Sequence, residues 1–311
     1  MGKERLKEEL IFKSGFKGDV KFEEPMSFHT SLKIGGPVDI FFAPMDIDSI
    51  ILVKNIVREK GYKFFAIGSG TNILVKDGGI KGVVLSMGYF RRIETFKIES
   101  DSVYFSAEAG ALLQRLVTIS KEKGLSGIEG LAGIPGTIAG AICGNSGAFG
   151  YEIKDVIEFV EIIDSAGLRR VLKKNDIVFG YRYSSISRDD IVLSAGIRLS
   201  RDSVDIVSKK IDEFMKIKSE RQPLWERSAG CVFKNPPNFS AGKLIEDAGC
   251  KGLRIGDVEV SRVHANFFIN KGRATASDFI RLIEEVKDRV YKKFDINLET
   301  EIKIIGEDAI N

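Results

Sequence analysis

Two glycine-rich segments are the parts of this chain whose composition most directly suggests chemistry. The first is the loop Gly68-Ser69-Gly70-Thr71-Asn72, and the second, at residues 124–150, has a glycine at every third or fourth position. Because glycine lacks a Cβ atom, such segments let the backbone approach a flat or anionic ligand closely. Together they favour a bound cofactor.

The first loop is expected to follow a strand, KFFAIG at residues 63–68. Its backbone amides can surround an anion such as a pyrophosphate, and its three polar side chains add donors. It is not a dinucleotide-binding fingerprint, because Ile73 stands where the third glycine belongs and no helix pattern begins at once. A plain tight turn explains this loop at least as well when the loop is taken alone.

Glycine-rich segments also occur in collagen, in membrane helices and in buried layers of turns. Collagen needs a strict triplet with abundant proline, whereas here the spacing changes to four after Gly136 and only Pro135 is present. Residues 130–151 carry no charge, but their few strongly apolar side chains argue against a membrane span. A buried layer of turns stays open as the structural alternative to a cofactor site.

Composition and charge narrow the class of protein further. A chain of 311 residues is long enough for two or three domains, and 47 basic against 44 acidic residues do not suggest a nucleic-acid surface. The first 25 residues are charged throughout and lack the apolar run of a secretory signal. Three cysteines and two unclustered histidines argue against a disulfide scaffold and a metal site, so we expect a cytoplasmic protein.

Hydrophobic periodicity predicts a small α/β domain in residues 1–90. VDIFFA at 38–43 is a strand, and Asp46 or Asp48 caps a helix that runs to Lys60 and ends at Gly61. The strand at 63–68, the glycine loop and the strand GVVLSM complete a β-α-β unit with a further strand.

Residues 91–202 are expected to form a second, mainly antiparallel α+β domain, and residues 203–294 a third α+β unit. An amphipathic helix over 203–221 leads into the third unit, and a last strand within residues 295–311, NLETEIKIIG, is expected to return to the second domain. The other expected strands lie at 93–98, 102–109, 156–164, 170–172, 191–199, 231–233 and 265–269, and the other expected helices at 112–123, 242–248 and 277–291.

Eight segments resemble, in the same order, those of the MurB family of UDP-N-acetylenolpyruvoylglucosamine reductases. They are SLKIGGPVD, AIGSGTNILVKDGG, GLSGIEGLAGIPGTIAGAICGNSGAFG, FGYRYS, SAGCVFKNP, AGKLIEDAG, HANFFIN and LETEIKIIG, and the resemblance as a whole runs from about Pro25 to Gly306. The loop GSGTN is shared with many flavin oxidases that have the same N-terminal fold. FGYRYS, AGCVFKNP and LETEIKIIG are specific to this reductase family.

The resemblance implies an α+β fold with a two-lobed FAD-binding region of the PCMH type and a third, substrate-binding domain. The FAD is non-covalent, because neither His29 nor Cys143 lies where related oxidases attach their flavin. Residues 68–72 are expected to hold its pyrophosphate. Four residues of the second segment are expected to lie along the cofactor from the other side: Gly136, Gly140, Gly147 and Ala148.

The implied reaction reduces the enolpyruvyl ether of UDP-N-acetylglucosamine to UDP-N-acetylmuramate, with NADPH as reductant, in the peptidoglycan synthesis that serves cell shape and division. The partners are therefore small molecules, with no nucleic acid or membrane, and the enzyme is expected to be a monomer. When hydride reaches the substrate, negative charge accumulates beside its carboxylate. Catalysis therefore needs a cation or donors there and an acid for the neighbouring carbon.

Three residues match the family's catalytic positions. Arg182 of FGYRYS is a planar cation suited to the carboxylate, although a surface salt bridge is the usual role of arginine. Glu301 would oppose the reaction if ionised, so the resemblance implies that it is protonated or neutralised by a cation such as Arg182. Cys231 stands where many relatives have a serine that donates the proton, and a thiol with a pKa of about 8.5 is mostly protonated at neutral pH. A buried, inert cysteine is the alternative.

Substrate contacts follow from the same match. Tyr181, Asn235 and His264 fall at positions that bind the sugar nucleotide in relatives, although some relatives have glutamine in place of His264. The run from Lys251 to His264 is too short for the tyrosine-bearing loop that closes over substrate in one type of this family, so the chain resembles the type lacking it. Candidates for the diphosphate are Arg221, Gln222 and Lys234.

Two other functions stay open from the sequence. One is an FAD-linked oxidase or dehydrogenase of the same superfamily, which would react rapidly with oxygen and ignore the UDP-sugar. The other is a binding module without catalysis, which would not need both Arg182 and Glu301.

Overall fold

The computed structural model describes residues 15–309, so the first 14 residues of the charged N-terminal stretch and the last two residues lie outside the described part. The chain divides into two compact units. The first contains the described residues up to Phe22, Asp39–Ser69 and Gly82–Lys216, and the second contains Glu23–Val38, Gly70–Lys81 and the residues from Ile217 onward. The first unit thus draws on both ranges expected to form the FAD-binding lobes, and the three domain boundaries stay a prediction.

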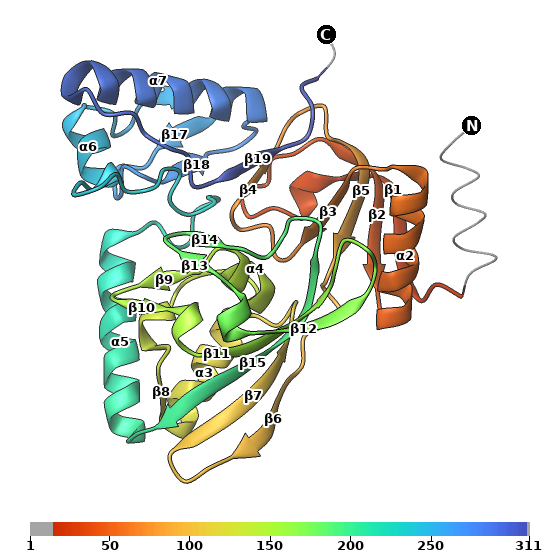
Figure 1. Cartoon of the computed structure of the whole chain (residues 1–311). Helices are drawn as coiled ribbons and strands as arrows, with labels where there is room; N and C mark the ends of the chain where they lie inside the picture. Colours follow the sequence, from red (N-terminus) through yellow and green to blue (C-terminus); the bar gives the residue numbers. More distant parts are fainter. Residues whose placement is uncertain (1–14, 310–311) are drawn as a thin grey trace. The chain divides into compact units, whose positions relative to one another are not determined.

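A four-stranded sheet and one helix form the small α/β part, most of which belongs to the first unit. The strand order is β1 (Gly18–Pro25), β2 (Pro37–Pro44), β5 (Ile80–Ser86) and β3 (Phe64–Ile67), with β3 and β5 parallel. Helix α2 (Ile47–Lys60) lies beside this sheet (Figure 1). Its expected ends are confirmed, because the Asp46 carboxylate accepts from the Ser49 amide at 2.8 Å and Gly61 adopts the left-handed conformation.

The larger part of the first unit is an antiparallel sheet, as expected. Its order is β12 (Arg169–Lys173), β11 (Ile157–Ile163), β15 (Ile191–Arg201), β7 (Ser102–Glu108) and β6 (Ile93–Ile98), and β8 (Leu125–Ser126) also pairs with β15. The helices are α3 (Leu113–Lys123), α4 (Ile138–Cys143) and α5 (Val204–Arg221), of which the residues from Ile217 onward belong to the second unit. Short elements complete it: η2 (Glu129–Leu131), β9 (Gly147–Ala148), β10 (Tyr151–Glu152), η3 (Ile153–Asp155), η4 (Lys174–Asp176), β13 (Phe179–Gly180) and β14 (Tyr183–Ser184).

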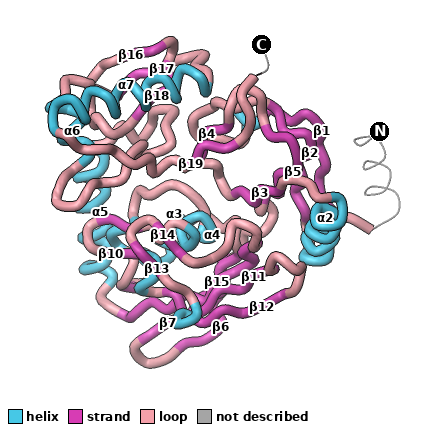
Figure 2. Tube along the Cα trace, turned by 45° about the horizontal axis from the view of Figure 1, so that its top comes forward, coloured by secondary structure: helices cyan, strands magenta, loops and turns pink. Residues whose placement is uncertain are grey.

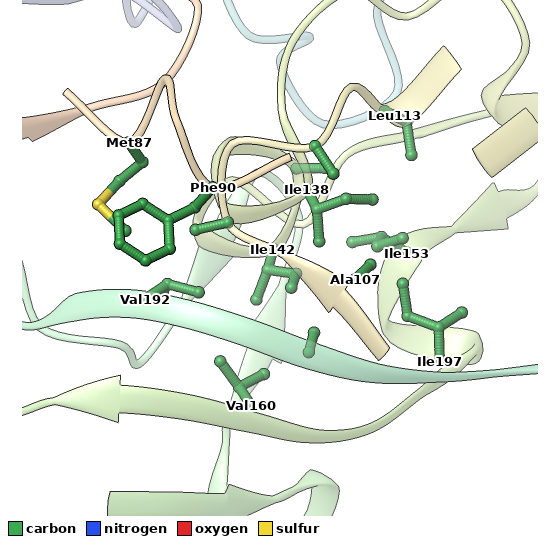
Figure 3. Packing of buried hydrophobic residues seen from close by; sticks show 14 of the residues in the cluster. Met87, Phe90, Ala107, Leu113, Ile138, Ile142, Ile153, Val160, Val192 and Ile197 are labelled. Atoms are coloured by element: carbon green, nitrogen blue, oxygen red, sulfur yellow. The ribbon is translucent and has the colours of Figure 1, made fainter. Parts of the chain in front are cut away.

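The core of the first unit fixes the position of the second glycine-rich segment. Ile138 and Ile142 of α4 are fully buried and lie near Ala107 and Ile197 of the sheet (Figure 3). Burial of each such side chain stabilises the fold by about 2 kcal/mol. A six-residue helix is marginal on its own, so packing against the sheet holds α4 and the glycine turns on either side of it.

The second unit has its own core around three antiparallel strands and two helices. The strands are β16 (Arg254–Ile255), β17 (Val258–Val260) and β18 (Phe268–Asn270), and the helices are α6 (Ala241–Asp247) and α7 (Ala276–Phe294), which runs beside the strands (Figure 2). Phe233, Phe268 and Phe279 fill this core. The unit also contains η1 (Met26–Phe28), β4 (Ile73–Val75) and β19 (Lys303–Ile305).

Two sequence expectations are corrected in the second unit. The last strand does not return to the antiparallel sheet of residues 91–202, because β19 pairs in parallel with β4, from Lys303 opposite Ile73 to Ile305 opposite Val75. The stretch 231–233 is not a strand, since Cys231 and Phe233 make only isolated bridges, to Phe267 and Thr300. Among the helices of residues 15–309, none has the length and apolar character needed to cross a membrane.

Candidate functional site

Gly68 touches the second glycine-rich segment inside the first unit. A Cβ atom added to Gly68 would lie 2.3 Å from Oγ1 of Thr137, which is far closer than real contacts allow. The Thr137 hydroxyl caps α4 by accepting from the Gly140 amide at 3.3 Å. The two glycine-rich segments therefore meet where α4 begins, and this contact requires glycine at residue 68.

Gly70 is constrained in the second unit by the segment around His29. Its φ of +62° is in the left-handed region, and an added Cβ atom would lie 2.0 Å from the His29 carbonyl oxygen. The Ser31 amide donates to the Gly70 carbonyl at 3.1 Å. Both glycines of the loop are thus needed for its backbone path, while Gly68 and Ser69 are exposed at its surface.

Asn72 joins the same loop to the C-terminal segment. Its side-chain amide donates to the Glu301 carbonyl at 3.4 Å, and the Lys303 amide donates to the Asn72 carbonyl at 3.1 Å. These bonds continue directly into the β4–β19 pairing. A residue expected to bind FAD and the expected catalytic glutamate are therefore held together within the second unit.

The glycines of the second segment differ in their roles. Gly136 has a φ of +125°, which favours glycine, and Gly140 is exposed in the first turn of α4, where an added Cβ atom would meet only Thr137 Oγ1 at 3.5 Å. Gly147 is buried, and a Cβ atom there would lie 2.7 Å from the Tyr151 carbonyl, because β9 pairs with β10. Packing within the β9–β10 turn is therefore enough to explain why residue 147 is glycine. Its neighbour Ala148 is half-buried.

Arg182 lies in the two-residue turn between β13 and β14 of the first unit. Its φ is +55°, and its guanidinium carbon lies 5.2 Å from the centre of the Tyr181 ring. The hairpin is fixed to the end of α4 from both strands, because Asn145 donates to the Gly180 carbonyl at 3.0 Å and Ser184 donates to the Cys143 carbonyl at 3.1 Å. Hydrogen bonds from the second glycine-rich segment therefore hold the turn that carries Arg182 in place.

Arg182 also contributes to the electrostatics of that region. The pKa of Glu152 is lowered, first by its hydrogen bond from Lys154 and to a smaller degree by the positive charge of Arg182. The exposed Tyr181 and half-buried Arg182 present an aromatic ring and a cation on one turn. Such a pair suits an anionic group carried on an organic ligand.

The segments that carry Cys231 and Glu301 are hydrogen-bonded to each other in the second unit. The Glu301 amide donates to the carbonyl of Val232, the residue after Cys231, at 2.8 Å, and Phe233 bridges to Thr300. Both Cys231 and Glu301 are half-buried. The expected thiol and the expected carboxyl group therefore come from adjacent, hydrogen-bonded segments that are far apart in sequence.

His264 is held as a neutral ring. Its Nδ1 accepts from the Asn266 amide at 3.2 Å, which leaves the proton on Nε2 as a donor. Burial lowers the pKa of His264, and the nearby positive charge of Lys251 lowers it further. The ring packs edge-on against Phe267, with 5.0 Å between centroids.

The remaining expected substrate residues of the second unit are partly engaged in the fold. The Lys234 ammonium pairs with the Glu299 carboxylate, and the Asn235 side-chain carbonyl accepts from the Ala241 amide at 3.0 Å. Arg221, the last residue of α5, is exposed, and the Gln222 amide closes the helix end on the Lys218 carbonyl at 2.8 Å.

The expected site residues are thus distributed over both units. Cys231 and Glu301 both belong to the second unit, which also holds five of the six expected substrate residues, namely Arg221, Gln222, Lys234, Asn235 and His264. Arg182 and Tyr181 belong to the first. Sequence reasoning missed Thr137 and Asn145, although a threonine directly before an apolar helical run is a standard N-cap signal.

Two family models match separate stretches of the chain. A family model described as an FAD binding domain matches residues 38–172. A second, described as the C-terminal domain of UDP-N-acetylenolpyruvoylglucosamine reductase, matches residues 222–305. The second match contains Cys231, His264 and Glu301.

Individual relatives match over nearly their whole length. UDP-N-acetylenolpyruvoylglucosamine reductase of Caldanaerobacter subterraneus is 42% identical over 94% of this chain and 95% of its own. The enzyme of the same name from Clostridium kluyveri is 40% identical over 93% of this chain and 94% of its own. The crystal structure of the MurB reductase from Thermus caldophilus, 31% identical, aligns with a TM-score of 0.78 over 93% of this chain and 99% of that one.

Proposed function

Because the chain belongs to the UDP-N-acetylenolpyruvoylglucosamine reductase family, we propose that it reduces the enolpyruvyl ether of UDP-N-acetylglucosamine to UDP-N-acetylmuramate with NADPH. The observation that carries the proposal is the 42% identity to a relative of that name over 94% of this chain. The region aligned with this relative is long enough to contain the matches to both the FAD binding domain and the reductase C-terminal domain. The enzyme is thus an FAD-containing oxidoreductase of peptidoglycan precursor synthesis. The cytoplasmic compartment and the monomeric state stay predictions.

The residues present fit FAD. Gly68 admits no side chain because of Thr137 and Gly70 admits none because of His29, while Gly68 and Ser69 are exposed to a ligand at the loop surface. We expect residues 68–72 to bind the pyrophosphate and Gly136, Gly140, Gly147 and Ala148 to line the cofactor. FAD held by these residues would supply the hydride chemistry that links NADPH to the terminal carbon of the substrate double bond.

Arg182 is assigned to the substrate carboxylate. Negative charge grows on this group as the double bond takes up hydride, and a guanidinium with two parallel N–H donors stabilises it more strongly than a point charge. The anchored hairpin supports this role, because a catalytic cation must be held in place before the charge develops. Glu301 is assigned beside the same group in a protonated or cation-neutralised form.

Cys231 is assigned as the acid. Hydride addition at the terminal carbon leaves a carbanion or enolate at the carbon that bears the carboxylate, and this carbon takes the thiol proton. A thiolate remains and regains a proton from water. The hydrogen-bonded neighbourhood of Glu301 and Cys231 supports this pairing of an acid with a carboxyl group.

The remaining residues are assigned to parts of the substrate according to the hydrogen-bond donors on their side chains. Arg221, Gln222 and Lys234 would bind the diphosphate, and Tyr181, Asn235 and neutral His264 the sugar nucleotide. Lys234 would have to exchange its pairing with Glu299 for a phosphate oxygen. This exchange costs little, because exposed ion pairs contribute about 1 kcal/mol or less.

One experiment tests the proposed function. The yellow protein is mixed with NADPH without oxygen until the flavin colour is lost, and the enolpyruvyl UDP-sugar is then added. We expect the colour to return with formation of one lactyl ether per flavin. If the colour returns only with oxygen, the chain is instead an oxidase of the same fold and the proposal is wrong.

A further inference from the structure

Trp225 is the only tryptophan of the chain and is 97% exposed. The next most exposed large apolar side chain among the described residues, Phe28, is 69% exposed. Tryptophan has the largest apolar surface of any side chain and is highly buried on average. Full exposure of this side chain therefore indicates a surface for a ligand or partner.

The loop that carries Trp225 is fixed on both sides within the second unit. The Glu226 amide donates to the Pro223 carbonyl at 3.1 Å, and the Glu226 carboxylate pairs with Lys271 at 3.2 Å. Further along, the Asn270 amide donates to the Arg227 carbonyl at 2.9 Å. The indole is thus displayed from an ordered backbone, so binding there costs little ordering of the loop.

The neighbours of Trp225 specify the chemistry of the ligand. Arg221 and Gln222, assigned above to the substrate diphosphate, directly precede the loop. In a nucleoside diphosphate the ribose separates the base from the diphosphate, so the base needs a contact a short distance from the diphosphate donors. Indole offers the largest aromatic face among side chains for a flat base.

We propose that Trp225 is the stacking platform for the uracil base of the UDP-sugar, an inference that rests on the proposed function. In this role Trp225 binds and orients substrate and takes no part in proton or hydride transfer. It would determine specificity for the nucleotide, because a sugar phosphate without a base gains nothing from the indole. The adenine of NADPH offers a similar aromatic face, so the test compares both bases.

The single tryptophan makes a direct measurement possible. Indole emission of the oxidised enzyme is recorded during titration with uridine diphosphate, with pyrophosphate and with adenosine 2′,5′-diphosphate. We expect saturable quenching by uridine diphosphate and none by pyrophosphate. Uridine diphosphate that binds by calorimetry without changing the emission would overturn the proposal, as would quenching by the adenine nucleotide alone.

Variants give the independent kinetic test. We expect Trp225→Ala to raise the KM for the enolpyruvyl UDP-sugar roughly tenfold, the size of a lost base stack, with kcat and flavin reduction by NADPH unchanged. Trp225→Phe should keep most of the affinity. Tyr291→Ala, on α7 and 48% exposed, is the matched control and should leave the KM unchanged.

The outcomes separate this inference from the proposed function. An unchanged KM in Trp225→Ala, with active wild-type enzyme, overturns only the role of Trp225. A wild-type protein that never reduces the enol overturns the proposed function. Quenching of the indole emission by uridine diphosphate would still test the role of Trp225 in that case. If Trp225→Ala instead dissociates an oligomer in sedimentation with the KM unchanged, the indole is a subunit contact and the proposal is wrong.

Discussion

The side-chain amide of Asn72 donates to the main-chain carbonyl of Glu301 at 3.4 Å, and the Lys303 amide donates back to the Asn72 carbonyl at 3.1 Å. Asn72 closes the loop expected to bind the FAD pyrophosphate, and Glu301 is the expected catalytic carboxyl group. The parallel pairing of β4 with β19 starts at the next residue of each segment, since Ile73 lies opposite Lys303. The loop expected to bind the cofactor and the segment that contains Glu301 are therefore hydrogen-bonded to each other.

Replacing Asn72 with alanine removes the side-chain bond and leaves the main-chain bond. We expect kcat for enol reduction, at saturating FAD and substrate, to fall by about three- to tenfold, the range for one lost hydrogen bond. Flavin reduction by NADPH serves as the internal control and should keep its rate. A parallel loss in both half-reactions would mean that Asn72 acts on the cofactor alone.

The contact between Gly68 and Thr137 predicts a coupled pair of substitutions. Gly68→Ala alone should largely abolish FAD retention, because its methyl group would overlap Thr137 Oγ1. Thr137→Ala alone should lower the free energy of unfolding by about 1 kcal/mol through loss of the α4 cap. In the double variant the nearest Thr137 atom would be Cβ, at 3.3 Å, so FAD content should recover relative to Gly68→Ala. Flavin absorbance per protein measures this, and no recovery would contradict the contact.

Local sequence signals predicted most single elements of the fold. Asp46 and Gly61 define α2 through side-chain capping and a left-handed end, both of which depend only on nearby residues. The partner of the last strand was not predictable in this way. β19 pairs with β4 across 230 residues, from Ile73 to Lys303, and an apolar strand pattern does not specify which edge it joins.

Asp77 links the segment after β4 to the start of α7. Its carboxylate accepts from the Ala276 amide at 2.8 Å and from the amide and hydroxyl of Ser277 at 2.9 and 2.7 Å. We expect Asp77→Ala to lower the free energy of unfolding by about 2 kcal/mol, because helix amides lose their acceptor and the helix dipole loses a negative charge. Denaturant unfolding followed by circular dichroism measures it.

Two variants calibrate the effect of Asp77. Asp77→Asn keeps an acceptor without the charge and should be intermediate. Ser277→Ala removes only the hydroxyl bond and should cost about 1 kcal/mol or less. Equal stability of Asp77→Ala and wild type would contradict this account of why residues 70–81 belong to the second unit.

His264 predicts a pH dependence of stability. Burial first, and then the charge of Lys251, lowers its pKa below the ordinary value of 6.5. As pH falls below that value, the unfolded chain takes up the proton before the folded ring does, so stability declines as pH falls toward the folded pKa. In His264→Gln this contribution is absent. The difference in unfolding free energy between the two proteins should change as the pH falls below about 7 and be constant above it. A constant difference throughout would contradict the lowered pKa.

The site was only partly predictable. The catalytic roles proposed for Cys231, Arg182 and Glu301 rest on family resemblance, since a lone thiol, cation or carboxylate has no local pattern that marks catalysis. The anchoring of Arg182 through Asn145 and Ser184 could not be predicted, because it depends on the contact between a hairpin and the end of α4. The engagement of Lys234 by Glu299 depends likewise on a nonlocal pairing of segments.

The role of Cys231 is tested most directly by separating the two half-reactions in its variants. Reduction of the flavin by NADPH should occur at the wild-type rate in Cys231→Ala and in Cys231→Ser, because in the proposed reaction the thiol acts only after hydride reaches the substrate. On addition of the enolpyruvyl UDP-sugar without oxygen, the flavin colour should return in the serine variant. In the alanine variant its return should slow by about a hundredfold or more, the usual effect of losing a general acid. Return of the colour at the wild-type rate in Cys231→Ala would contradict the assignment of the thiol as proton donor.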